Sequence, residues 1–374
     1  MLKQSAQPGN PSGRLGLDPP CHGISVEGFG EARRRLLQVF RRGCANDDHF
    51  KHQSSSQTGH IIQAAMQTPV RTRYLSISKR GIDFESVPMR LFQKSKKLGV
   101  WDGMLIDLEQ DKKDWAAASI GSREGLIGTT ALFQAGEEAV TLDLLPLVGA
   151  MARAGRLEEE IYLTSFLGEE AKHCEFFRRW LNDVADATGD LHDQMGPNYS
   201  HLFFVELPTA MGRLASDDSP EALARALTTY NMMIEGVLAE TGYYSYSRQL
   251  EKGRLFPGLA QALRLISRDE TRHIRFGVYM LQLLIQEHPG MWDVVQARMN
   301  ELLPYVLGML GSEENPPVED GSTVEYIVPP DELTAFAMTQ FQRRMRVLER
   351  ARTQSRVEVE EETSDELTEE FFAG

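Results

Sequence analysis

Two copies of the pattern Glu-x-x-His constrain this chain more than any other feature of its sequence. The first copy consists of Glu170 and His173, and the second consists of Glu270 and His273. Residues three apart on an α-helix share a face, so each copy presents a carboxylate and an imidazole side by side. Apolar residues flank both copies, and burying carboxylates there without partners would be costly. Bound cations would remove that cost, so we expect a metal site.

Each copy is preceded by a further glutamate on another predicted helix. Glu137 stands 33 positions before Glu170, and Glu235 stands 35 positions before Glu270. Two helices that give one Glu each, with two that give Glu-x-x-His, form the dinuclear carboxylate sites of ferritin-like proteins. Four carboxylates neutralise two divalent ions, and this donor set suits iron or manganese without deciding between them. The expected metal ligands are Glu137, Glu170, His173, Glu235, Glu270 and His273.

Helix-starting and helix-ending residues divide the middle of the chain and predict an all-α fold. The expected class is a ferritin-like four-helix bundle with extra flanking helices. Pro146 is expected to kink the first long helix, while Ser219 and Pro220 supply the cap and the first position of the third. The four ligand-bearing helices are expected at residues 122–152, 157–187, 219–251 and 257–288, and shorter ones at 199–214, 292–310 and 331–352.

The two ends of the chain differ from this middle in composition. Residues 1–81 hold twelve Lys and Arg against five Asp and Glu, which indicates a poorly ordered basic extension with a short helix near residues 31–42. The ferritin-like dimetal domain is expected at residues 82–312, followed by an irregular segment and a helix at 313–356. Residues 357–374 are rich in Glu and are expected to form an acidic tail.

Charge and cysteine content exclude several classes of protein. The formal net charge of −14 argues against nucleic-acid binding. Three widely spread cysteines do not form a disulfide framework and indicate a reducing cytoplasm. Apolar runs are too short for a transmembrane segment.

Acidic residues stand directly beside several of the predicted metal ligands. Asp269 immediately precedes Glu270 and is expected to accept a hydrogen bond from the non-ligating nitrogen of His173, which would orient that imidazole. A salt bridge with an adjacent arginine is the alternative role for Asp269. Glu138 and Glu169 also adjoin ligands, but on a helix they are expected to point elsewhere and to form surface or inter-helix ion pairs.

Four stretches of this chain, in order, resemble the R2-like ligand-binding oxidases of the ribonucleotide reductase small-subunit superfamily. They are QAGEEAVT, YLTSFLGEEAKH, TYNMMIEGVLAETGYY and RDETRHIRFG, and the likeness runs from about residue 82 to about residue 310. The resemblance implies a homodimer with one manganese and one iron ion per subunit, two irons being the alternative. It assigns Glu137, Glu170 and His173 to manganese and Glu235, Glu270 and His273 to iron, with Glu170 bridging the two ions.

The same resemblance implies a covalent modification and a ligand. Activation of O₂ would create an ether cross-link between the phenol oxygen of Tyr230 and the β-carbon of Val140, and a long-chain fatty acid would ligate the metals through its carboxylate. Val140 lies three residues after Glu137, on the same helix face. Tyr230 lies five residues before Glu235, off the face of a regular helix, so we expect a π-bulge there. The substrate, product and electron donor are left open.

Three other functions share this ligand pattern. The radical-generating small subunit of ribonucleotide reductase usually carries a tyrosine one turn after the first motif histidine, where Phe177 stands here. A manganese–iron subclass also lacks that tyrosine, so Phe177 alone does not exclude this role. The small subunit also relays the radical through a tyrosine in its C-terminal tail, and no tyrosine follows Tyr326. Ferritin-like iron storage normally uses far shorter subunits in large shells. A soluble acyl desaturase would need an electron donor and an acyl-carrier surface, neither of which the sequence reveals.

Overall fold

The computed structural model describes residues 73–311 and 328–359. Within these ranges the regular structure is helical and no strand occurs, which confirms the all-α prediction. The short helix expected near residues 31–42 and most of the expected acidic tail lie outside the described residues. Among the described helices, none combines the length and the apolarity that a membrane crossing requires.

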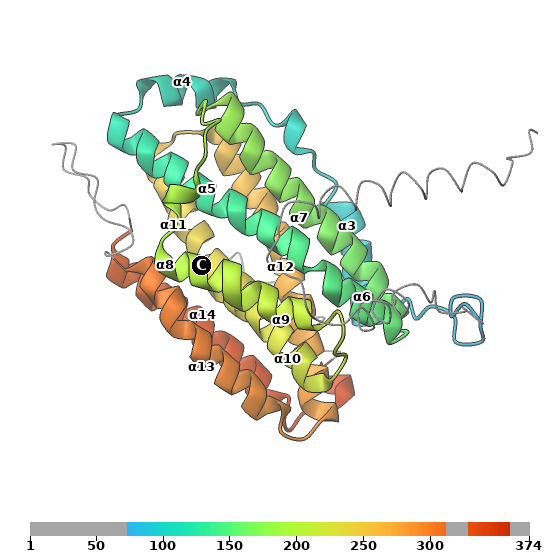
Figure 1. Ribbon diagram of the computed structural model, residues 1–374. Coiled ribbons are helices and arrows are strands. Elements are labelled where there is room, and N and C mark those ends of the chain that lie inside the picture. The colour runs from blue at the N-terminus through green and yellow to red at the C-terminus, as the bar shows by residue number, and fades with distance from the viewer. Residues whose placement is uncertain (1–72, 312–327, 360–374) are drawn as a thin grey trace, which may run out of the picture. The chain divides into compact units, whose positions relative to one another are not determined.

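Four long helical rods form the centre of the fold, as the ligand spacing predicts. They are α5 (Ile120–Asp143), α7 (Leu157–Asp183), a composite rod, and α12 (Pro257–Glu287). The composite rod runs through α10 (Pro220–Leu227), the π-helix η4 (Thr228–Ala239) and α11 (Glu240–Gly253). Figure 1 shows α5 and α7 side by side, with α11 and α12 behind them. This is the ferritin-like four-helix bundle.

Pro146 ends the first rod instead of kinking it. The chain continues from α5 into a separate helix, α6 (Leu145–Arg153), in which Pro146 occupies the first turn. Proline has no N–H to donate and favours the start of a helix over its interior. The amide of Leu144 still donates to the carbonyl of Val140 at 3.0 Å, so the boundary is tight. One long predicted helix is therefore two.

The composite rod contains the irregular turn that the Tyr230–Glu235 spacing calls for. η4 is π-helical over twelve residues, longer than a single bulge, and its residues from Thr228 to Val237 are buried. It lies so close to α12 that a β-carbon at Gly277 would come within 2.2 Å of the β-carbon of Asn231. A glycine is therefore required at position 277.

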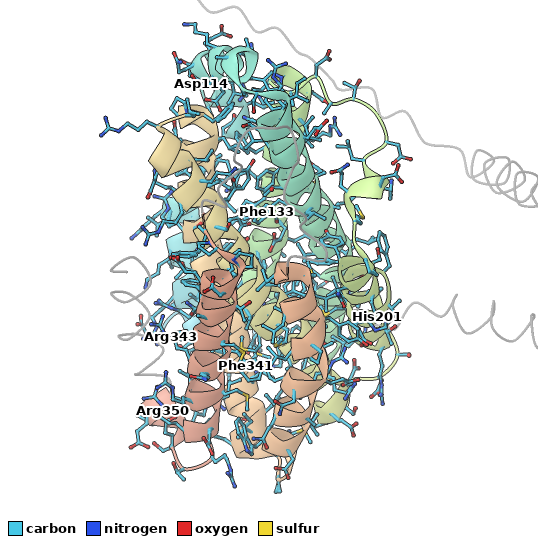
Figure 2. The ribbon with its side chains drawn as sticks, turned by 90° about the vertical axis from the view of Figure 1, so that its left-hand side faces the viewer. Asp114, Phe133, His201, Phe341, Arg343 and Arg350 are labelled. Carbon is cyan, nitrogen blue, oxygen red and sulfur yellow. The ribbon has the colours of Figure 1, made fainter. Side chains whose placement is uncertain are left out.

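Shorter helices cover the bundle. The expected helices near 199–214, 292–310 and 331–352 are present, whereas the sequence patterning gave no prediction for the first two helices of the described chain. Figure 2 shows Phe341 of α14 turned toward the core and Arg343 and Arg350 toward the outside. The covering elements are α3 (Val87–Leu98), η1 (Gly103–Leu105), α4 (Glu109–Ala117), η2 (His192–Gln194), α8 (Pro197–His201), the π-helix η3 (Leu202–Glu206), α9 (Leu207–Arg213), α13 (Met291–Leu310) and α14 (Pro330–Arg350).

The apolar core divides into two clusters with the candidate site between them. Phe166 of α7 belongs to the larger cluster, and Phe176 and Phe177 of the same helix belong to the smaller one. The motif residues Glu170 and His173 lie between these phenylalanines along α7. The charged groups of the site are thus enclosed by apolar side chains at both ends.

Candidate metal centre

The six residues predicted as ligands converge at one place inside the bundle. They form two overlapping groups, and within each group one ligand atom per residue lies within 4.8 Å of the others. Glu170 and Glu270 belong to both groups and offer oxygen atoms to both positions. The first group is Glu137, Glu170, His173 and Glu270, and the second is Glu170, Glu235, Glu270 and His273.

Both imidazoles turn the same nitrogen, Nδ1, toward the carboxylates. The Nδ1 atom of His173 lies 3.3 to 3.5 Å from oxygens of three glutamates. The Nδ1 atom of His273 lies 3.1 to 3.9 Å from oxygens of three glutamates. Within residues 73–311 and 328–359, neither Nδ1 has a hydrogen-bond partner, and the same holds for one buried oxygen of Glu170 and one of Glu235. Buried polar atoms are normally paired, so these four atoms fit metal ions between them.

The electrostatics of the cluster show that it requires positive charge. Burial raises the pKa of Glu137 to about 8 and places the pKa of Glu235 well above its usual range. Burial lowers the pKa of His173 and of His273, but the surrounding carboxylates outweigh it and the net pKa of both lies well above the ordinary value. Protons or divalent cations are the two ways to supply that charge, and the donor set of carboxylates and imidazoles suits iron and manganese.

The outer nitrogens of the two imidazoles are held by acids from the opposite motif. His173 Nε2 lies 3.3 Å from Asp269 Oδ2, and His273 Nε2 lies 2.9 Å from Glu169 Oε2. Arg272 joins the two acids, because its Nη2 donates to both at 2.6 Å. Such contacts set the orientation of a ligating imidazole.

Glu169 has more contacts than its position beside Glu170 in the sequence suggested. It makes the inter-helix pair with Arg272, but it is buried and contacts His273 as well. The expected inter-helix ion pair is confirmed, whereas the contact of Glu169 with the outer nitrogen of His273, which comes from another helix, was not predicted. The sequence contained a signal for this contact. Glu169 precedes Glu170 as Asp269 precedes Glu270, so the same kind of contact with an imidazole could have been predicted for both acids. Glu138, by contrast, is exposed as expected.

Aromatic rings enclose the two imidazoles differently. Trp101 stacks on His173 with ring centroids 6.0 Å apart, and its indole N–H donates to Asp269 at 2.8 Å. Lys172 also donates to Asp269 and lies over the Trp101 ring. Phe166 stacks on His273 with centroids 3.6 Å apart. The sequence gave no signal for Trp101, which follows α3 in a connecting segment.

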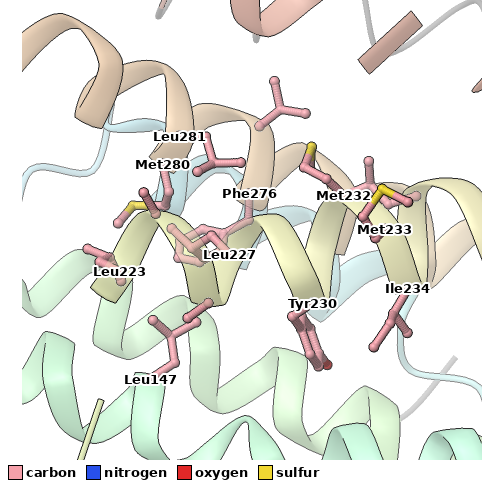
Figure 3. Close-up of a cluster of buried hydrophobic side chains, with 14 of the residues drawn as sticks. Leu147, Leu223, Leu227, Tyr230, Met232, Met233, Ile234, Phe276, Met280 and Leu281 are labelled. Atoms are coloured by element: carbon pink, nitrogen blue, oxygen red, sulfur yellow. The ribbon is translucent and has the colours of Figure 1, made fainter. Parts of the chain in front are cut away.

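Two tyrosines donate hydrogen bonds to the carboxylates. The hydroxyl of Tyr230 donates to Glu170 at 3.2 Å, and that of Tyr243 donates to Glu137 at 2.8 Å. Figure 3 shows Tyr230 directed from η4 toward the green helices, with Met232 and Met233 on the opposite side. Val140 is buried on α5, one turn after Glu137.

The position after His173 that a radical tyrosine would occupy is apolar. Phe177 is fully buried and stacks on Phe133, with ring centroids 5.5 Å apart. Phe133 in turn stacks on Tyr243 at 4.7 Å, and Figure 2 places Phe133 within the bundle. A phenylalanine ring has no hydroxyl hydrogen to lose, so a phenoxyl radical at residue 177 is excluded.

Comparisons with known proteins agree with this geometry. A family model described as ribonucleotide reductase, small chain, matches residues 92–305. Among solved structures, an R2-like ligand-binding oxidase variant with an aerobically reconstituted Mn/Fe cofactor is 37% identical, with a TM-score of 0.68, and the match covers 74% of this chain and 98% of that one. A second variant, anaerobically reconstituted, is 38% identical with a TM-score of 0.70, and covers 75% and 98%.

Proposed function

Because the chain belongs to the R2-like ligand-binding oxidases of the ribonucleotide reductase small-chain family, we propose that it is an oxidoreductase that activates O₂ at a dinuclear manganese–iron centre. The observation that carries this proposal is the convergence of six buried donor residues, four of which hold a buried atom without a hydrogen-bond partner among the described residues. The matched structures contain a reconstituted Mn/Fe cofactor. Two irons remain the alternative composition, since ligand types do not separate the two metals.

The proposed ligand roles follow the two overlapping groups. Manganese would be held by the group that contains His173 and iron by the group that contains His273, with Glu170 between them. A metal pair bound here would supply the redox chemistry that reduces O₂. The protein's own part is to hold both imidazoles through Asp269 and Glu169 and to exclude water with the surrounding aromatic rings.

We further propose that Tyr230 and Val140 form an ether cross-link. The O–H hydrogen of Tyr230 and the Cβ–H hydrogen of Val140 would be removed, an O–C bond would form, and O₂ would accept the two electrons and two protons. Burial puts the pKa of Tyr230 well above 10, so its phenol keeps the proton until oxidation and donates it in a hydrogen bond to Glu170 at 3.2 Å.

The positions of these two residues in the chain support the cross-link. The matched variants carry substitutions at a valine and a tyrosine 90 positions apart, and at a glycine four positions before the valine. Val140 and Tyr230 are also 90 positions apart, and Gly136 stands four before Val140. The two residues of the proposed cross-link therefore have the same spacing as the residues altered in those proteins.

A long-chain fatty acid, or a similar lipid-like molecule, is the proposed ligand. Its carboxylate would join the metal ligands, and its tail would lie among the apolar side chains that surround the site. Val237 is buried in η4, whereas Leu167 and Leu238 are only half-buried at the edge of the larger core cluster. Extraction of the purified protein followed by mass spectrometry of the lipids tests this part of the proposal.

We propose a homodimer in the cytoplasm as the working form. Exposed apolar side chains on α5, α6 and η3 support a subunit contact on these elements, and α9 contacts all three. These side chains are Leu142, Leu145, Phe204 and Val205. Light scattering coupled to size exclusion distinguishes a dimer from the many-subunit shell that iron storage would require.

Aerobic reconstitution with Mn(II) and Fe(II) tests the proposed chemistry. The wild-type chain is expected to lose two hydrogens and to yield a linked peptide pair that contains Val140 and Tyr230. Anaerobic reconstitution and the variant Tyr230→Phe should both load metal without linkage. Unlinked peptides from wild-type protein that holds both metals would refute the cross-link. Nucleotide-reducing activity with a large reductase subunit would favour the reductase role, which Phe177 disfavours.

A further inference from the structure

Two buried arginines outside the metal centre lie at the two ends of the π-helix η4. Arg298 of α13 and Arg344 of α14 are each only 2% exposed. Both helices lie outside the four rods and both contact η4, and Figure 1 shows them side by side. A buried guanidinium group requires acceptors for its N–H groups. The acceptors that these two arginines use therefore show which parts of the chain they hold.

Arg298 holds the junction between α10 and η4. Its Nε atom donates to the hydroxyl of Thr229, the second residue of η4, at 2.9 Å. That hydroxyl in turn donates to the carbonyl oxygen four residues earlier, in α10, at 2.7 Å. The other two nitrogens of Arg298 lie 2.7 Å from an oxygen of Glu206 and 3.0 Å from an oxygen of Glu301. Two carboxylates thus fix the guanidinium group, which fixes the residue directly before Tyr230.

Arg344 holds the opposite end of η4. Its Nη2 atom donates to Glu240, the first residue after η4, at 2.7 Å. The backbone amide of Glu240 donates to the carbonyl oxygen of Glu235, five residues earlier, which is a π-helical bond. A β-carbon at Gly236 would lie 2.8 Å from Nε of Arg344, so this arginine also lies against the backbone beside the candidate ligand. Arg344 therefore holds the turn that begins at Glu235.

The conformation of η4 explains why it requires support at both ends. π-Helical turns are rare and usually occur as single bulges, whereas η4 extends over twelve residues. Tyr230 and Glu235 are five residues apart, and side chains at that spacing share a face only where the turn is wider than that of an α-helix. A change of η4 to α-helical turns would therefore rotate one of these side chains away from the other.

We propose that Arg298 and Arg344 are positioning residues that keep η4 π-helical and thereby direct Tyr230 and Glu235 into the metal centre. This assignment rests on the metal centre and the cross-link proposed above. It gives α13 and α14, which contribute no candidate ligand, a defined part in the chemistry. The two arginines should have separable effects, because Arg298 acts beside Tyr230 and Arg344 acts beside Glu235.

Thr229→Val tests the first contact, because it removes one hydroxyl and leaves both ion pairs of Arg298 in place. Thr228→Val is the matched control, since Thr228 is equally buried in η4 and its hydroxyl has no hydrogen-bond partner among the described residues. The full-length protein is loaded with Mn(II) and Fe(II) without O₂ and its amide hydrogen exchange is measured. Peptides from residues 228–234 should exchange roughly tenfold faster in Thr229→Val than in the control, because a hydrogen bond from a charged donor is lost. After O₂ is added, the linked fraction should fall while the metal content is unchanged.

Arg344→Met combined with Glu240→Gln tests the second contact and leaves no charge buried alone, so the variant should fold. The matched control makes the same two changes at Arg346 and Glu349, which are exposed on α14. Peptides from residues 235–240 should exchange roughly tenfold faster in the first double variant only. Its metal content after gel filtration should fall toward one ion per subunit, because the turn that carries Glu235 is no longer held.

Exchange in η4 that matches the controls in both test variants would overturn the proposal. Equally faster exchange in α5 and α7 would overturn it too, because that result would show a general loss of stability instead of a change confined to η4. Wild-type protein that holds both metals but forms no linkage would refute the cross-link, and the exchange rates of residues 228–240 would still decide the positioning role.

Discussion

The two halves of the metal centre share a sequence pattern but not a structure. In each half an acid precedes the motif glutamate and contacts the imidazole of the other half: Asp269 holds His173, and Glu169 holds His273. The helices that carry the single glutamates differ, because Glu137 lies on the α-helix α5 and Glu235 lies on the π-helix η4. The same types of ligand thus occur in both halves, but the helices that hold them differ in conformation.

The two outer acids also differ in the number of groups that hold them. Asp269 receives hydrogen bonds from Trp101, Lys172 and Arg272 in addition to its contact with His173. Among the described residues, Glu169 receives a side-chain hydrogen bond from Arg272 alone, besides its contact with His273. The His173 half is therefore stiffened by its outer acid, and the His273 half by the packing of η4 against α12. This difference predicts unequal responses to matched substitutions.

Removal of a shared glutamate should have the largest effect, because such a glutamate belongs to the ligand groups of both halves. Glu170→Ala takes an oxygen from both groups, so both ions should be lost on gel filtration. Glu137→Ala removes a ligand from one group only and should cost mainly one ion. Metal analysis by plasma mass spectrometry measures both. The exposed neighbour Glu138 supplies the control, Glu138→Ala, which should retain wild-type metal content. Two ions retained in Glu170→Ala would contradict the shared role.

Neutralising the two outer acids should lower the metal affinity to different extents in the two halves. Asp269→Asn is expected to weaken metal binding by roughly 10- to 100-fold, the usual cost of losing such a contact. Glu169→Gln should weaken it less, because fewer groups depend on that carboxylate. Titration of each apoprotein with Mn(II) gives the two affinities, and Glu175→Gln, at an exposed position of α7, serves as control. Equal losses of Mn(II) affinity in the two variants would show that the additional hydrogen-bond donors to Asp269 do not contribute to metal binding.

The convergence of the six candidate ligands could be predicted because helical periodicity links a sequence pattern to a direction in space. Spacing of three residues placed Glu170 with His173, and a spacing of five that does not suit an α-helix indicated the π-helical turn before Glu235. Neither rule gives the length of η4, which depends on its close approach to α12. Trp101 was not predicted because it lies outside the patterned helices and meets His173 only through tertiary packing.

A smaller effect is expected from crowding the contact between η4 and α12. Gly277→Ala would bring a β-carbon within 2.2 Å of Asn231, whose side chain donates to Glu235 at 2.7 Å. Overpacking of this kind typically costs about 1–3 kcal/mol. Gly136→Ala is the matched change on α5, where the nearest atom would be 3.5 Å away. Chemical denaturation should show a loss of stability for Gly277→Ala only, accompanied by weaker metal binding at the group that contains Glu235.

The helix caps should give the smallest effect and no difference between the halves. The side chain of Ser119 accepts from the amide of Ser122 at the start of α5, and that of Ser219 accepts from the amide of Ala222 at the start of α10, both at 3.2 Å. Replacing either serine by alanine should cost about 1 kcal/mol in the free energy of unfolding. Equal losses of stability in the two variants, without a change in metal content, would show that the difference between the two halves comes only from η4 and the outer acids. A selective loss of one ion in Ser219→Ala would instead mean that the start of the composite rod already controls the position of Glu235.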